Sequence, residues 1–89
     1  MIEVKFSDTF NRHLDTRLTK PQLVKAMDVI YLFIEHPDHP ELRNHKLYGK
    51  WKGYRSISVE GDLRLHYRIL DTDSVIFAAA GSHEQLYRD

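Results

Sequence analysis

The chain has 89 residues, 42% of them hydrophobic, and its 13 lysines and arginines balance 13 aspartates and glutamates. This length supports one modest core, and the absence of cysteine excludes disulfides, thiolate metal sites and thiol nucleophiles. Because no apolar run is long enough to cross a membrane and the first residues lack a signal-peptide pattern, we expect a soluble, cytoplasmic protein.

The first residues predict a strand and a short helix. Residues 2–6 alternate apolar and polar side chains, a pattern typical of a half-buried strand. Ser7 is suited to cap a helix, and an apolar side chain recurs every fourth residue from Phe10 to Leu18. We therefore expect an amphipathic helix over residues 7–18.

A second helix follows directly. Residues 19–22 have the form of a capping box with proline in the first helical turn, and they begin the helix. It ends at His36, because a residue that precedes a proline avoids helical geometry. The apolar stripe of this helix is expected to consist of Leu23, Met27, Ile30, Tyr31 and Ile34.

The second half of the chain predicts a long loop and three strands. Two prolines and two glycines mark residues 37–53 as an ordered loop. Strands are expected over residues 54–59, 62–70 and 75–80, with a tight turn at Glu60-Gly61 and a short turn or helix over residues 81–87. A two-residue turn would place Arg55 opposite His66 and Ile57 opposite Arg64.

These elements predict a fold of the α+β class in the order β-α-α-β-β-β. Two helices would pack on one twisted, mainly antiparallel sheet, and residues 1–89 would form a single domain.

Positive charge is concentrated in the expected loop and in the long strand. Residues 43–55 contain no acidic residue, and their basic side chains are Arg43, His45, Lys46, Lys50, Lys52 and Arg55. On the strand over residues 62–70, Arg64, His66 and Arg68 would share one face because alternate residues point the same way. This surface suits a polyanionic ligand or an acidic partner.

Histidine is the main candidate for side-chain chemistry. Six histidines suggest a metal site, and His36 and His39 lie three residues apart, but no third ligand pattern accompanies them, so we expect a solvated loop and no metal. His83 follows Gly81 directly after the last strand, where an exposed imidazole can transfer protons. The alternative is that Ser82 caps a last helical turn and His83 is merely solvated.

Three segments carry a family resemblance. Residues 45–55 (HKLYGKWKGYR), 60–67 (EGDLRLHY) and 81–87 (GSHEQLY) resemble, in order and spacing, the RelE/YafQ-like toxins of bacterial type II toxin-antitoxin systems. The resemblance implies a small, metal-independent mRNA endoribonuclease that needs no cofactor, acts in the ribosomal A site and inhibits translation. It also implies a cognate antitoxin that neutralises the toxin by wrapping its surface.

The resemblance assigns roles by position. His83 matches the catalytic histidine, Asp62 the acid of the hairpin, and His45 the loop histidine, so these three are the expected catalytic residues. The expected RNA-binding residues are Lys46, Lys50, Trp51, Lys52, Arg55, Arg64 and Tyr87. Cations among them would neutralise phosphate charge, and aromatic rings would stack on unpaired bases.

Two positions depart from the family pattern. The chain has Ser58 where YafQ-like members often have a histidine, and Ala79 where an arginine commonly precedes the Gly-x-His motif. Three functions therefore remain open. One is a ribosome-dependent nuclease, another is a non-catalytic inhibitor like the ParE-type toxins that act on DNA gyrase, and the third is an attenuated toxin that mainly binds its antitoxin.

Overall fold

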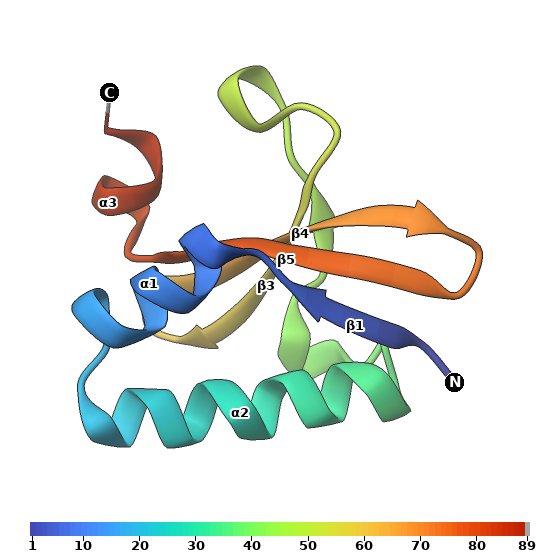
Figure 1. Cartoon of the computed structure of the whole chain (residues 1–89), viewed down its shortest axis with the longest axis horizontal. Helices are drawn as coiled ribbons and strands as arrows, with labels where there is room; N and C mark the ends of the chain where they lie inside the picture. Colours follow the sequence, from blue (N-terminus) through green and yellow to red (C-terminus); the bar gives the residue numbers. More distant parts are fainter. Residues whose placement is uncertain (89) are drawn as a thin grey trace.

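A computed structural model describes residues 1–88, in which five strands form one sheet and three α-helices accompany it (Figure 1). Asp89, the last residue of the expected domain, lies outside the described residues. The strands are β1 (Glu3–Phe6), β2 (His45–Lys46), β3 (Arg55–Glu60), β4 (Leu63–Asp71) and β5 (Ser74–Gly81). The helices are α1 (Asp8–Arg17), α2 (Lys20–Glu35) and α3 (His83–Tyr87), with short 3₁₀ helices η1 (Pro40–Leu42) and η2 (Gly49–Trp51).

The strands follow the order β1-β5-β4-β3-β2, and only β1 and β5 run parallel. This arrangement confirms the expected α+β fold with a mainly antiparallel sheet. The interpretation of residues 37–53 as a loop was incomplete, because they contain η1, η2 and the edge strand β2. A two-residue strand whose side chains are both exposed has no alternation to reveal it.

Both long helices begin at the predicted caps. The Ser7 hydroxyl accepts a hydrogen bond from the Phe10 N–H, and Thr19 forms a capping box with Gln22. These local interactions satisfy backbone donors that the first turn of a helix leaves without partners. Within residues 1–88, none of the helices is both long and apolar enough to cross a membrane.

The hydrophobic core lies between the sheet and the two long helices. Phe10 on α1 and Phe33 on α2 both pack against Phe77 on β5, with ring centroids 5.4 and 5.6 Å apart. The predicted stripe on α2 was partly wrong, because Met27 is 42% exposed and Tyr31 is 69% exposed. The buried positions of α2 are Ala26, Ile30 and Phe33. This stripe is rotated about the helix axis from the predicted one, and the small Ala26 permits close packing.

The register of the β3–β4 hairpin differs from the prediction. Arg55 lies opposite Tyr67 and Ile57 opposite Leu65, so the predicted pairs with His66 and Arg64 were wrong. A bulge shifts the register between Ser58 and Glu60, and the turn consists of residues 61–62 instead of 60–61. As a result Ile57 and Leu65 both point into the core, whereas Ser56 lies opposite His66.

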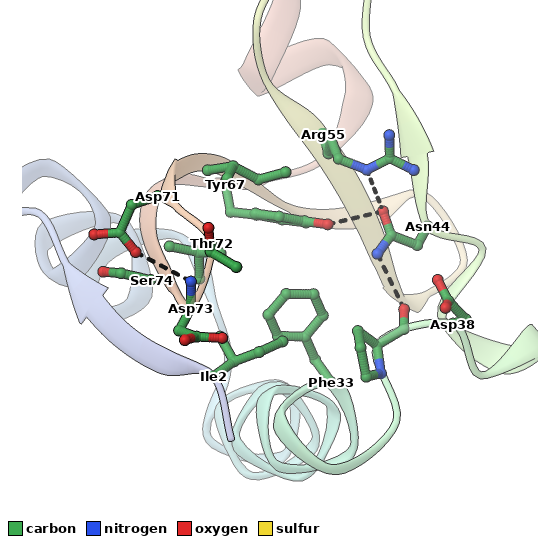
Figure 2. Close-up of a pocket in the computed structure, with 13 residues that line it drawn as sticks. Ile2, Phe33, Asp38, Asn44, Arg55, Tyr67, Asp71, Thr72, Asp73 and Ser74 are labelled. Atoms are coloured by element: carbon green, nitrogen blue, oxygen red, sulfur yellow. Dashed lines mark hydrogen bonds between the residues drawn. The ribbon is translucent and has the colours of Figure 1, made fainter.

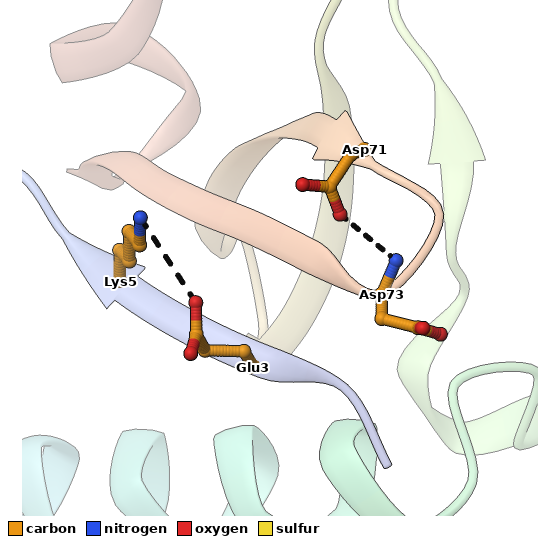
Figure 3. A network of polar contacts seen from close by, with 4 residues as sticks. All are labelled: Glu3, Lys5, Asp71 and Asp73. Atoms are coloured by element: carbon orange, nitrogen blue, oxygen red, sulfur yellow. Dashed lines mark hydrogen bonds and ion pairs between the residues drawn. The ribbon is translucent and has the colours of Figure 1, made fainter.

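The β4–β5 turn is joined to the first strand. The Asp73 N–H donates to the Asp71 carboxylate at 3.1 Å (Figure 3), and the Glu3 N–H donates to the Asp73 carbonyl at 2.7 Å. The Glu3 carboxylate and the Lys5 ammonium group lie 3.9 Å apart on the solvent side. The backbone bonds fix the turn, whereas an exposed ion pair of this length contributes little.

Candidate active site on the histidine face

One row of side chains crosses four strands. His45 on β2 lies opposite Ser56 on β3, Ser56 opposite His66 on β4, and His66 opposite Ala79 on β5. Directly opposed residues in a sheet share a face, so the four side chains point the same way. Arg64, two residues before His66, faces the same side. We call this side of the sheet the histidine face. Figure 1 shows α3 and the η2 loop on this side and α2 across the other.

Aromatic rings cover the middle of the histidine face. The Trp51 ring meets the His66 ring edge to face, with centroids 4.6 Å apart, and the Tyr87 ring lies 6.0 Å from His66. The Trp51 indole N–H donates to the Leu86 carbonyl at 2.9 Å, and the Lys50 ammonium donates to the Arg88 carbonyl at 2.8 Å. These bonds hold the η2 loop and α3 together across the sheet.

His83 is the first residue of α3 and is exposed. Ser82 caps the helix by a capping box with Gln85, as the alternative interpretation of this segment expected. A side chain at Gly81 would place its Cβ 2.8 Å from the Gln85 side-chain oxygen, so a larger residue would displace the Gln85 side chain that completes the capping box. The His83 ring stacks on the Tyr87 ring with centroids 4.6 Å apart. The turn after β5 therefore projects an imidazole beside the aromatic cover.

His66 is the most buried ionisable group of the site, with 1% of its surface exposed. Burial lowers its pKa to about 4, and the positive charges of His45, Arg64 and His83 act in the same direction. The imidazole is therefore neutral at pH 7. The sheet register places His45 and Arg64 beside His66, and ring contacts through Tyr87 link His83 to it.

The second exposed imidazole of the site belongs to His45. Its Nδ1 lies 2.8 Å from the Arg43 carbonyl oxygen. Because a carbonyl only accepts, Nδ1 carries the proton and Nε2 is left for proton transfer. Within residues 1–88, no group of three or more histidine, aspartate and glutamate side chains is arranged to hold a metal ion.

Asp62 is exposed in the turn between β3 and β4 and makes no hydrogen bond or ion pair within residues 1–88. Because Arg64 lies opposite Gly81, this turn lies at the end of the sheet from which α3 departs. Asp62 is thus near the site along the sheet, without a direct contact to either exposed histidine.

Three predicted RNA-binding residues lie on the other side of the sheet. Arg55 donates from Nε to the Asn44 side-chain oxygen at 2.9 Å, and the Tyr67 hydroxyl donates to the same oxygen at 3.0 Å (Figure 2). These groups border a pocket of about 240 Å³ whose rim includes three aspartates, Asp38, Asp71 and Asp73. Lys46 and Lys52 border a neighbouring pocket with Arg55.

Apart from Asp62, the structure thus divides the predicted site residues into two groups. On the histidine face it brings together His45, Lys50, Trp51, Arg64, His83 and Tyr87. On the other side lie Lys46, Lys52 and Arg55. Ser56 and His66 were not among the predicted site residues, although His66 was expected on the basic face of its strand. Alternation along β4 places His66 on this face, but its burial depends on Trp51 and Tyr87, which come from distant segments.

Comparisons with known proteins show the family and the fold of the chain. The family model described as "Bacterial toxin of type II toxin-antitoxin system, YafQ" matches residues 2–88. A Haemophilus influenzae protein named as a YafQ toxin is 30% identical over an alignment 92 positions long. The match covers 94% of this chain and 90% of that protein. The crystal structure of Escherichia coli YafQ is 25% identical in sequence to this chain and has a TM-score of 0.78. The match covers 98% of this chain and 99% of the YafQ chain. The E. coli DinJ-YafQ complex is similar with a TM-score of 0.76, the same identity and the same coverage.

Proposed function

Since the chain belongs to the YafQ family of type II toxin-antitoxin toxins, we propose that it is a metal-independent endoribonuclease that cuts mRNA on the ribosome and inhibits translation. Residues 1–89 act as one toxin domain in the cytoplasm. The observation that carries the proposal is the cluster of two exposed imidazoles and one guanidinium around His66 on the histidine face.

The cluster supplies the three functions that RNA cleavage without a metal requires. The ribose 2′-OH loses its proton and attacks the adjacent phosphorus, the bond from phosphorus to the 5′-oxygen breaks, and that oxygen takes a proton. His83 and His45 are the two proton carriers, and Arg64 stabilises the charge on the phosphate. Asp62, in the turn at the same end of the sheet, is the third residue of the proposed catalytic set.

The aromatic cover suits single-stranded RNA. Tyr87 already stacks on an imidazole, and Trp51 is fixed by its hydrogen bond to the Leu86 carbonyl, so both rings are placed for stacking on unpaired bases. Lys50 adds positive charge beside them. We place the RNA backbone away from the scissile bond against Lys46, Lys52 and Arg55, on the other side of the sheet.

A cognate antitoxin completes the proposal. E. coli YafQ has been solved in complex with DinJ. We propose that a comparable antitoxin places an acidic segment over the basic loop of residues 43–55, because charge complementarity favours this association. If co-expression with the protein of the adjacent reading frame yields no co-purified complex, this part of the proposal is wrong.

The test of the nuclease is growth arrest by the wild-type chain beside the variants His83→Ala and His83→Gln. Both variants should lose toxicity and message cleavage by roughly 10²-fold or more, because neither replacement transfers protons near pH 7. Circular dichroism should show unchanged folding, since His83 is exposed. Toxicity with intact message and cleaved plasmid DNA would instead identify a ParE-like inhibitor of DNA gyrase. Binding of the antitoxin without any toxicity would identify an attenuated toxin.

A further inference from the structure

We propose that Ser56 and His66 form, with Arg64, a recessed polar subsite that binds the ribose–phosphate backbone of the substrate RNA. This inference rests on the proposed function and extends it to two residues that neither the sequence pattern nor the comparisons assign.

The first argument is that polar atoms are buried there without partners. Within residues 1–88, four buried side-chain atoms lack a hydrogen bond, and three of them are Ser56 Oγ, Arg64 Nη1 and His66 Nδ1. Ser56 and His66 are each only 1% exposed. Folded proteins pair almost all buried polar groups, so three orphaned groups on one sheet face indicate a ligand that the isolated chain lacks.

The second argument is the complementarity of these groups to an RNA backbone. Ser56 lies directly opposite His66, and Arg64 lies on the same face of β4 two residues away. Arg64 supplies a positive charge for a phosphate oxygen. The hydroxyl of Ser56 and the neutral imidazole of His66 supply hydrogen bonds without further charge. Together they match one phosphate and its neighbouring ribose hydroxyl.

The third argument concerns access to these groups. Trp51 is fixed by its indole hydrogen bond, whereas the Tyr87 hydroxyl makes no hydrogen bond within residues 1–88 and its ring contacts the rings of His66 and His83. Tyr87 also lies at the end of a helix of only five residues. Movement of the Tyr87 ring, with Trp51 as a fixed wall, opens the subsite to the RNA.

One experiment measures the affinity of the full-length chain for a single-stranded RNA tetranucleotide. Because the proposed cleavage needs the ribosome, the free RNA stays intact during the titration. Ser56→Ala and His66→Leu should each weaken binding about tenfold, the loss expected for one hydrogen bond to a charged oxygen. Ser74→Ala is the matched control, because Ser74 Oγ is also buried without a partner but Ser74 lies at the other end of β5. The affinity of the Ser74→Ala variant for the tetranucleotide should stay at the wild-type value.

A second measurement separates a functional role from a structural one. If His66 serves the ligand, His66→Leu removes an orphaned polar group from the folded state, and the thermal midpoint should rise by roughly 4 °C or more. A structural role of His66 predicts that the midpoint falls.

The outcomes distinguish the inference from the proposed function. RNA binding and message cleavage that are unchanged in Ser56→Ala and His66→Leu would overturn the subsite and leave the nuclease intact. The subsite is equally overturned if the Ser74→Ala control weakens binding as much as Ser56→Ala does. A wild-type chain that neither binds RNA nor cleaves message would overturn both.

Discussion

The imidazole of His13 on α1 accepts a hydrogen bond from the backbone N–H of Ala80 on β5, with 3.1 Å between the nitrogens. Arg17, one turn later, donates to the Ala80 carbonyl at 3.2 Å. The first strand pairs with β5 only as far as Phe77, so the edge of β5 beyond that point has no neighbouring strand. Two helix side chains therefore take the place of a strand just before the turn that carries His83.

We expect His13→Leu to destabilise the fold by about 1–3 kcal/mol, because it leaves the N–H of the buried Ala80 without a partner. Urea denaturation at pH 7 measures this loss. Arg12→Leu, at an exposed position on the same helix, is the control and should change the free energy of unfolding by about 0.5 kcal/mol or less. Equal stabilities of the two variants would contradict the role of the hydrogen bond.

Stability should fall below pH 6.5 because of His66. The pKa of a histidine in the unfolded chain is about 6.5, and in the folded chain that of His66 is about 4. Between these values the unfolded chain binds more protons, so the stabilisation is complete above pH 6.5 and is lost as the pH falls toward 4. The loss reaches about 3 kcal/mol, since each pH unit in this interval is worth about 1.4 kcal/mol.

The measurement is urea denaturation at pH 7, 5.5 and 4 for the wild-type chain and His66→Leu. The pKa of His13 is also lowered by burial and by its arginine neighbours, but this contribution is present in both proteins and cancels in their difference. Parallel pH profiles would show that His66 does not titrate as described.

Asn44 should matter for stability and not for RNA. Its oxygen accepts from Arg55 and Tyr67, and its amide donates to the Pro37 carbonyl at 3.1 Å. We expect Asn44→Ala to destabilise the fold by about 2–3 kcal/mol, because it leaves two half-buried donors without their acceptor. Asn44→Asp keeps that acceptor and should recover part of the loss in thermal or urea denaturation. RNA affinity of the folded protein should fall no further in either variant than in Arg55→Ala, and a tenfold loss beyond that would place Asn44 itself in the RNA interface.

Substitution of Arg64 and substitution of Arg55 should change the salt dependence of RNA binding by different amounts. Arg64 has an orphaned guanidinium nitrogen on the histidine face, whereas Arg55 is bonded to Asn44 on the other side of the sheet. Arg64→Ala should weaken RNA binding and reduce the slope of log affinity against log salt by about 0.7, the value for one lost phosphate contact on a single strand. Arg55→Ala should change the slope less. Equal changes in slope would place both residues equally on the RNA path.

The features of the fold that could be predicted from the sequence are those that depend on local interactions. The caps at Ser7 and Thr19 and the short C-terminal helix depend on residues within four positions of one another, and all were confirmed. The hairpin register was wrong because a bulge at residues 58–60 depends on which side chains the core accepts. The alternation of β3 and β4 favours the observed register, because only that register puts the core residues Ile57 and Leu65 opposite each other.

The candidate site was predictable where it depends on single positions. His45, Arg64, His83 and Tyr87 were expected from the motifs, and the structure brings them to one face, whereas their roles stay predictions. Burial of His66 was not predictable, because it requires Trp51 and Tyr87, from segments on either side of the hairpin, to meet over β4. The separation of Arg55 from this face follows from the same one-residue register shift.

The two positions that depart from the family pattern are cross-strand neighbours of two basic residues of β4. Ser58 lies directly opposite Arg64, and Ala79 lies directly opposite His66. Residues in this relationship are side-chain neighbours although they belong to different strands. A guanidinium on β4 therefore lies beside Ser58, and an imidazole on β4 lies beside Ala79. Each opposed pair thus keeps one basic side chain, supplied by the strand between the two departing positions and of the other chemical type.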